Sequence, residues 1–157
     1  MPETIVDILR RAKVGDIALD TAPTVHPDAT LEQVCRLLEG RERSAVVVCD
    51  GEQVCGIFTQ RDLLYRAAEG ALDPKGAIGE LMTRSPRTFQ AGRPLSEALD
   101  VMVEGGFRQL PLVDGEGRAR GLLTTWDVLA FIARRFPEET LNLPPRLHQV
   151  LSTPEGA

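Results

Sequence analysis

The stretches GIFTQRD (residues 56–62) and GLLTTWD (residues 121–127) share one pattern. Each contains a glycine, two apolar residues, a threonine and, three positions after the threonine, an aspartate. The likeness extends outward, because an offset of 64 aligns Leu31 with Leu95 and, after one inserted residue, an offset of 65 aligns the two quoted stretches. Self-similarity over a whole unit indicates one supersecondary unit that is used twice.

Each unit is predicted to have the order β-α-β-β-α. A short extended piece, APTVHP or SPRTFQ, precedes a helix whose apolar residues recur with the 3.6-residue period of one helix face. Thr30 and Gln33 form a capping box for the first of these helices, and Pro94 suits the first turn of the second. The apolar residues are Leu31, Val34, Cys35 and Leu38 in the first unit and Leu95, Ala98, Leu99 and Met102 in the second.

A hairpin and a second helix complete each unit. The near-continuous apolar runs at 44–50 and 109–114 indicate strands that are buried on both faces. An Asp-Gly pair follows each run and is a strong turn signal, so VCGIF and ARGLL are predicted to return as hairpin strands. The last helix of each unit is predicted to begin at Thr59 or Thr124.

One unit of about 60 residues has only a marginal core on its own. We therefore expect an α+β fold in which the two units pack against each other with pseudo-twofold symmetry, joined by a polar surface linker at 68–77. The expected organisation is an N-terminal helix at 1–13, the two units at 14–70 and 78–136, and an extended arm at 137–157.

Composition narrows the class of protein. The chain has 157 residues, of which 43% are hydrophobic and 26% charged, as in globular proteins. Its net charge is −5 and no stripe of Lys and Arg occurs, so we expect neither nucleic acid nor a membrane as a partner. No signal peptide or apolar run of roughly 20 residues is present, so the expected location is the cytoplasm. The three cysteines are then expected to be reduced, and no spacing predicts a metal site.

The two threonine–aspartate pairs, Thr59 with Asp62 and Thr124 with Asp127, have two interpretations. They can be helix caps, in which the threonine oxygen accepts from a first-turn amide and the aspartate favours the positive helix end. They can also form a nucleoside phosphate site, in which the helix N-terminus and the hydroxyl favour a phosphate and the carboxylate accepts from a ribose diol. The repetition of the pair at two equivalent corners favours the second interpretation without excluding the first.

The doubled unit resembles a pair of CBS (cystathionine-β-synthase-type) domains, also called a Bateman module. The similarity covers roughly residues 8 to 136 and includes RSAVVVCDGEQVCGIFTQRDLL and FRQLPLVDGEGRARGLLTTWDVL, with the Gly-h-h-Thr-x-x-Asp ends among its more specific features. The resemblance implies binding of an adenosine compound, AMP, ADP or ATP first and S-adenosylmethionine or NAD behind them. It also implies dimerisation of the module into a flat disk.

The resemblance further implies two composite clefts, each with its Thr and Asp from one repeat and its base pocket from the other. Cleft one comprises Leu122, Thr124 and Asp127 with walls from Ala18, Pro23, Ser44 and Ala45. Cleft two comprises Ile57, Thr59 and Asp62 with walls from Thr83, Pro86, Arg108 and Gln109.

Three further side chains near these corners carry open alternatives. Arg61 could pair with a phosphate, and so could Arg108, whose alternative is a surface salt bridge of little energetic value. Trp126, the counterpart of Arg61, could pack in the core, line the ligand or cover a dimer contact.

The expected function is that of a regulatory module. It would bind an adenosine nucleotide without consuming it and would signal by conformational change to a separate, unidentified target protein. The alternative is a dimerisation scaffold whose clefts no longer bind a ligand. We expect no enzymatic activity, because the sequence has no nucleophile–base pair, metal-ligand spacing or Walker-type loop.

Overall fold

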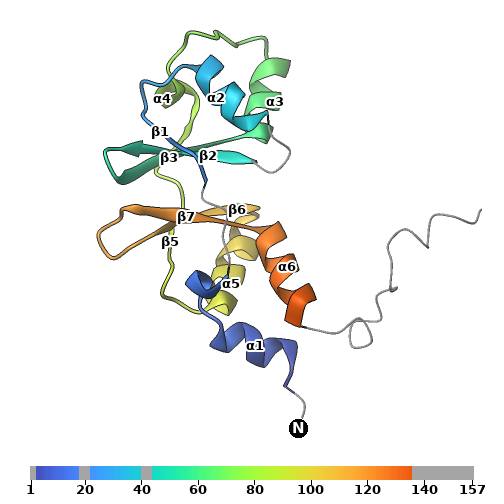
Figure 1. Ribbon diagram of the computed structural model, residues 1–157. Helices are drawn as coiled ribbons and strands as arrows, with labels where there is room; N and C mark the ends of the chain where they lie inside the picture. Colours follow the sequence, from blue (N-terminus) through green and yellow to red (C-terminus); the bar gives the residue numbers. More distant parts are fainter. Residues whose placement is uncertain (1–2, 18–21, 40–43, 136–157) are drawn as a thin grey trace, which may run out of the picture.

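The computed structural model describes residues 3–17, 22–39 and 44–135. Figure 1 shows two β-sheets facing each other across the middle of the molecule, with helices on the outer side of each sheet. The predicted arm at 137–157 lies outside the described residues, as does Ala18. Within the described part of the chain, no helix has the length and apolar character needed to span a membrane.

The chain begins with helix α1, which is followed by the elements of repeat one. Thr4 caps α1 in a reciprocal pair of hydrogen bonds with Asp7. The elements are α1 (Ile5–Arg11), the 3-10 turn η1 (Val14–Asp16), β1 (Thr24–Val25), α2 (Leu31–Leu38), β2 (Ala45–Asp50), β3 (Gln53–Thr59) and α3 (Gln60–Ala68).

Repeat two contains the same β-α-β-β-α series, from β5 to α6, preceded by helix α4 and the short strand β4. The predicted β-α-β-β-α units are therefore both confirmed, as is the α+β class. The elements are α4 (Ile78–Leu81), β4 (Thr83–Arg84), β5 (Phe89–Gln90), α5 (Leu95–Gly105), β6 (Gln109–Val113), β7 (Ala119–Thr124) and α6 (Thr125–Arg135).

The two sheets have the strand orders β1-β2-β3-β4 and β5-β6-β7. In each sheet a short first strand runs parallel to the second, and the second and third form the predicted antiparallel hairpin. Gly51 has a φ of 63° in the first hairpin turn, a conformation that glycine adopts without steric cost. The register pairs Ala45 with Thr59 and Gln109 with Thr124, so each threonine stands beside the start of the preceding strand.

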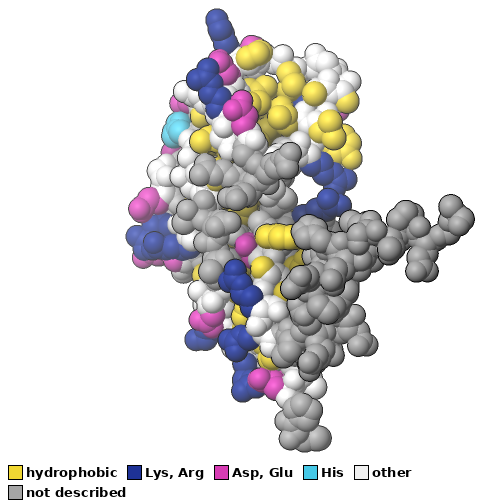
Figure 2. Space-filling view, turned by 45° about the vertical axis from the view of Figure 1, so that its right-hand side comes forward, with side chains coloured by type: hydrophobic (Ala, Val, Ile, Leu, Met, Phe, Trp, Pro, Cys, Tyr) yellow, Lys and Arg dark blue, Asp and Glu magenta, His cyan; other side chains and the backbone are white. Residues whose placement is uncertain are grey.

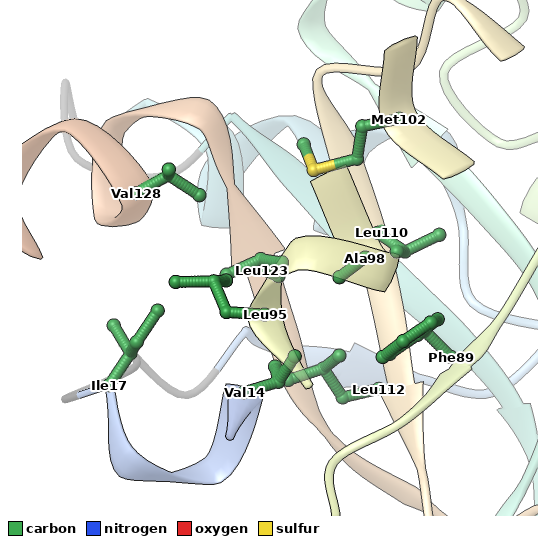
Figure 3. Close-up of a cluster of buried hydrophobic side chains, with 10 residues drawn as sticks. All are labelled: Val14, Ile17, Phe89, Leu95, Ala98, Met102, Leu110, Leu112, Leu123 and Val128. Atoms are coloured by element: carbon green, nitrogen blue, oxygen red, sulfur yellow. The ribbon is translucent and has the colours of Figure 1, made fainter. Parts of the chain in front are cut away.

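The opening segments of the two repeats are exchanged. Val14 and Ile17 open repeat one in the chain but pack in the core of repeat two, as Figure 3 shows. Ile78, the counterpart of Val14 at an offset of 64, is fully buried in the core of repeat one. Strand β4 likewise joins the sheet of repeat one. Each core is therefore complete only when the other repeat contributes its opening segment.

A third apolar cluster lies where the sheets face each other. Alternate residues of β2 point to opposite faces, so Val46 and Val48 pack under the helices while Ala45 and Val47 pack toward the second sheet. Leu122 of β7 belongs to the same inter-sheet cluster, which confirms that the repeats form one packed module. The cysteines are free thiols, and Cys49 and Cys55 contact different clusters although they occupy neighbouring strands.

Two details differ from the sequence predictions. Pro94 is the N-cap of α5, one residue before the first turn that we predicted for it. The linker at 68–77 is mostly exposed, as predicted, but it also completes helix α2. The carbonyl oxygens of Gly76 and Pro74 accept hydrogen bonds from the amides of Leu31 and Glu32, each at 2.9 Å. These two amides lie in the first turn of α2 and have no partner within the helix.

Candidate functional site

The corner between β3 and α3 is held by a capping box of Thr59 and Asp62. The Asp62 amide donates to Thr59 Oγ1 at 3.1 Å, and the Thr59 amide and hydroxyl donate to Asp62 Oδ2 at 2.9 and 3.0 Å. Both hydrogen bonds that Asp62 accepts use the same oxygen, so Oδ1 accepts none from the described residues. The carboxylate thus caps the helix with one oxygen and offers the other to an external donor.

The corner between β7 and α6 repeats this geometry. The Asp127 amide donates to Thr124 Oγ1 at 3.2 Å, and the Thr124 amide and hydroxyl donate to Asp127 Oδ2 at 2.8 and 2.9 Å. Both aspartates are half-buried. Helix capping and ligand binding are consequently compatible functions of one residue at each corner.

Asp62 lines a cavity of about 550 Å³ between the repeats, a volume typical of small-molecule sites. Every residue assigned to cleft two lines this cavity. Ile57, Thr59 and Asp62 come from repeat one, and Thr83, Pro86, Arg108 and Gln109 come from segments that follow it in the chain. The structure thus brings residues of both repeats together at one cavity.

The cavity also contains residues that the sequence interpretation missed. Arg87 and Phe107 lie on the loops after β4 and α5, and Phe107 is 40% exposed. Ser85 has a φ of 47°, a left-handed conformation that no other described non-glycine residue adopts. Backbone strain of this kind costs about 1–3 kcal/mol and gathers at ligand sites. The remaining unpredicted lining residues are Gln60, Gly106 and Pro111.

Ser44, which we assigned to cleft one, lines this cavity together with Thr59. The reason is the hairpin register, which places the start of β2 beside the end of β3, and the Gln60 amide donates to the Ser44 carbonyl oxygen at 3.0 Å. Ser44 is thus fixed at the corner that begins α3.

The structure describes only some of the residues assigned to cleft one. Leu122 and Ala45 are buried in the inter-sheet cluster, where they contact other apolar side chains. Pro23 is half-buried, and its carbonyl oxygen accepts from the Val47 amide at 3.0 Å. Ala18 lies outside the described residues, so the wall that it was predicted to form is not described.

The structure decides between some of the alternatives for the exposed side chains. Trp126 is 73% exposed, so the interpretation that it packs in the core is wrong. Arg108 has no ion pair with any described residue, which removes the surface salt bridge as its role in this part of the chain. Arg61 donates to the Tyr65 hydroxyl at 3.2 Å and lies 5.4 Å from the Tyr65 ring centre. This hydrogen bond raises the pKa of Arg61, which keeps its charge.

The family profile described as the CBS domain matches residues 14–69 and 78–134, which together are well over half of the chain. The chain belongs to the CBS domain family. The two matched segments contain the two threonine–aspartate corners of this CBS pair, and the resemblance found in its sequence is confirmed.

Several relatives share the CBS pair in different contexts. An uncharacterized protein of Methanopyrus kandleri is 29% identical over 123 residues, which are 77% of this chain and 63% of the relative. Inosine-5'-monophosphate dehydrogenase of Nitrosopumilus maritimus is 28% identical over 78% of this chain but only 25% of the enzyme. The chain thus spans under two thirds of each of these relatives.

A solved structure described as CBSX2 in complex with AMP superposes on this CBS pair with a TM-score of 0.69. It is 26% identical in sequence, and the match covers 78% of this chain and 97% of that chain.

Proposed function

We propose that this CBS pair is a regulatory module that binds an adenosine nucleotide in the cavity between its repeats. The observation that carries the proposal is the single cavity that Thr59 and Asp62 share with Arg108 and Gln109. A similar CBS protein has been solved with AMP, which supports the choice of an adenosine ligand.

The lining residues suit the parts of a nucleotide. Ile57 and Pro86 offer apolar surface to a base, and Asp62 Oδ1 can accept from a ribose hydroxyl. Arginine side chains at the same cavity can bind phosphate oxygens with two parallel hydrogen bonds. No step in this scheme breaks a bond, so the ligand acts by binding.

Signalling would follow from the composite cavity. A ligand that touches both repeats binds most tightly to one relative placement of them, and it shifts the population toward that placement. The target is proposed to be a separate protein. The proposed location is the cytoplasm, where the free thiols of Cys35, Cys49 and Cys55 would stay reduced.

Calorimetric titration of ligand-stripped protein with AMP, ADP, ATP, S-adenosylmethionine and NAD tests the proposal. Two substitutions of Asp62 separate binding from capping. Asp62→Asn keeps an oxygen for the cap but presents an amide donor in place of Oδ1, whereas Asp62→Ala loses both functions.

We expect Asp62→Asn to weaken nucleotide binding at least tenfold with little change in unfolding free energy. Asp62→Ala should in addition lose about 1 kcal/mol of stability, the usual cost of a lost cap. The absence of heat with every ligand, or undiminished binding by Asp62→Asn, would overturn the proposal. Turnover of any nucleotide above its uncatalysed rate would contradict a purely regulatory role.

Homodimerisation is the second proposed property, and the exposed apolar residues of α3 and α6 support it. Leu64 and Leu129 are 69% and 56% exposed and occupy equivalent positions of the two repeats. Tyr65 and Trp126 are exposed on the same two helices, and Figure 2 shows hydrophobic side chains gathered over the upper half of the molecule. A second copy could cover both helices with its own equivalent pair, as in an isologous interface.

Sedimentation equilibrium of the wild type and of Leu64→Glu/Leu129→Glu tests the dimer. The wild type should be dimeric and the variant monomeric with an unchanged circular dichroism spectrum. Trp126 is the single tryptophan of the chain, and its emission should shift to the red in the monomer. A monomeric wild type would exclude this interface. The scaffold alternative would gain support if dimerisation persisted in a protein that binds no nucleotide.

A further inference from the structure

The cavity of cleft two carries a net positive charge in an acidic protein. Arg61, Arg87 and Arg108 line it, and Asp62 is the single acidic residue among its lining residues. The whole chain has a net charge of −5, so this concentration of guanidinium groups is local. Figure 2 shows a group of Lys and Arg side chains at the edge of the molecule between its upper and lower halves.

The charges of these arginines are not neutralised within the described structure. Neither Arg87 nor Arg108 forms an ion pair or a side-chain hydrogen bond with a described residue. Arg61 forms no ion pair with a described residue and donates to the neutral hydroxyl of Tyr65, although the nearby Asp62 carboxylate acts on its charge through space. By contrast, Arg36, Arg93 and Arg118 each lie within 3.0 Å of a carboxylate, at 2.7, 2.6 and 2.9 Å. These three arginines lie outside the cavity and are paired with carboxylates, whereas Arg87 and Arg108 have no carboxylate partner among the described residues.

The arginines come from three separate segments. Arg61 lies in the first turn of α3, Arg87 follows the strained Ser85 and Pro86, and Arg108 directly precedes β6. One phosphate group can occupy one guanidinium fork through two parallel hydrogen bonds. A single phosphate places its oxygens at one point of the cavity, whereas a chain of two or three phosphates can extend toward guanidinium groups from more than one segment.

We infer that cleft two is selective for an adenosine di- or triphosphate over the monophosphate. This inference rests on the proposed function and names the ligand class of the same site. Each added phosphate engages a further guanidinium group. S-adenosylmethionine has a cationic sulfonium and no phosphate, so we expect it to bind more weakly than ADP or ATP.

The test compares affinities for AMP, ADP and ATP by calorimetry in wild type, Arg87→Gln, Arg108→Gln and Arg36→Gln. ADP or ATP should bind the wild type at least tenfold tighter than AMP, because charge-assisted hydrogen bonds each contribute a factor of this order. Arg87→Gln and Arg108→Gln should each reduce that preference several-fold, because either loss weakens binding of ATP more than binding of AMP. Arg36→Gln removes the same charge from α2, outside the cavity, and should leave the preference unchanged.

Salt provides a second readout. The affinity for ATP should fall more steeply with ionic strength than the affinity for AMP, and Arg87→Gln should flatten the difference. AMP binding as tight as ATP binding would overturn the inference and leave the proposed function intact. Failure of all three nucleotides to bind would overturn the proposed function itself.

Discussion

The side-chain amide of Gln53 donates to the carbonyl oxygen of Glu116 at 2.9 Å, which joins the hairpin turn of repeat one to that of repeat two. Backbone hydrogen bonds accompany this contact, from the Ala119 amide to the Glu52 carbonyl oxygen at 2.9 Å and from the Val54 amide to the Gly117 carbonyl oxygen at 3.4 Å. The two sheets are therefore connected at the hairpin tips, away from the corners that carry the threonine–aspartate pairs.

Gln53→Ala should lower the free energy of unfolding by about 0.5–1.5 kcal/mol, the net contribution of one hydrogen bond. Urea unfolding followed by circular dichroism measures this change. Gln90→Ala, on the exposed face of β5, is the control and should stay within about 0.5 kcal/mol of the wild type. Equal effects of the two substitutions would argue that the tip contact contributes nothing to stability.

Because the opening segments are exchanged, substitutions in one repeat should lower the folding stability of the core of the other repeat. Ile78→Ala removes a fully buried side chain from the core of repeat one and should cost about 2–5 kcal/mol. Val14→Ala should also destabilise the protein, through the core of repeat two. Val103→Ala, at an 80% exposed position of α5, should change little.

Amide exchange distinguishes where each defect acts. In Ile78→Ala, protection should fall first in β2 and β3 of repeat one, although residue 78 follows both strands in the chain. In Val14→Ala it should fall first in β6 and β7. Protection that falls first in the other repeat in each variant would contradict the exchange of opening segments.

The environment of Asp114 predicts that the second hairpin loses stability at acidic pH. Desolvation raises the pKa of its carboxyl group. The carboxylate also accepts hydrogen bonds from the backbone amides of Arg118 and Glu116 and from the guanidinium groups of Arg118 and Arg120. These hydrogen bonds outweigh desolvation and hold the pKa far below its usual value. Because the pKa is lower in the folded state, ionised Asp114 contributes stability above the unfolded pKa of about 3.9, and this contribution is lost as the pH falls through the folded value.

Asp114→Asn should therefore be less stable than the wild type at neutral pH, and the difference should shrink as the pH falls below about 4. Unfolding in urea at a series of pH values measures it. Asp100→Asn removes one negative charge at an exposed position of α5 and controls for net charge. A stability difference that does not change with pH would contradict this account of Asp114.

Gly106 ends helix α5 with a φ of 66° and has open space where a Cβ atom would lie. Gly106→Ala should therefore cost about 1–2 kcal/mol through backbone conformation alone. Gly92→Ala meets no atom within 4 Å and its φ lies outside the left-handed region, so it is the matched control. Thermal unfolding compares the two variants, and equal melting temperatures would be inconsistent with this explanation.

The sequence predicted the elements because their signals are local. The helical period from Leu31 to Leu38, the Thr30–Gln33 capping box and the two Asp-Gly turns each depend on neighbouring residues only, and the structure confirms all of them. Cleft two could be assigned because its corner residues lie in the most recognisable part of the repeat.

The missed features depend on contacts between distant segments. The apolar character of Val14 and Ile78 predicts burial but does not indicate which repeat buries them. Arg87 lies on a loop without periodicity, so its position at the cavity depends on the path of β4 into the sheet of the other repeat. Trp126 sits on a helix with apolar residues on more than one face, and the sequence did not show which face is buried.

The exchanged opening segments bear on the ancestry of this chain. A polypeptide with only one repeat would leave a hollow at the place that Ile78 fills, and it would leave its own Val14 unburied. Two such polypeptides would repair each other by trading these segments, as in a domain-swapped pair. The simplest precursor is accordingly a two-chain assembly of half-length proteins, and gene fusion would have made permanent a partnership that folding already required.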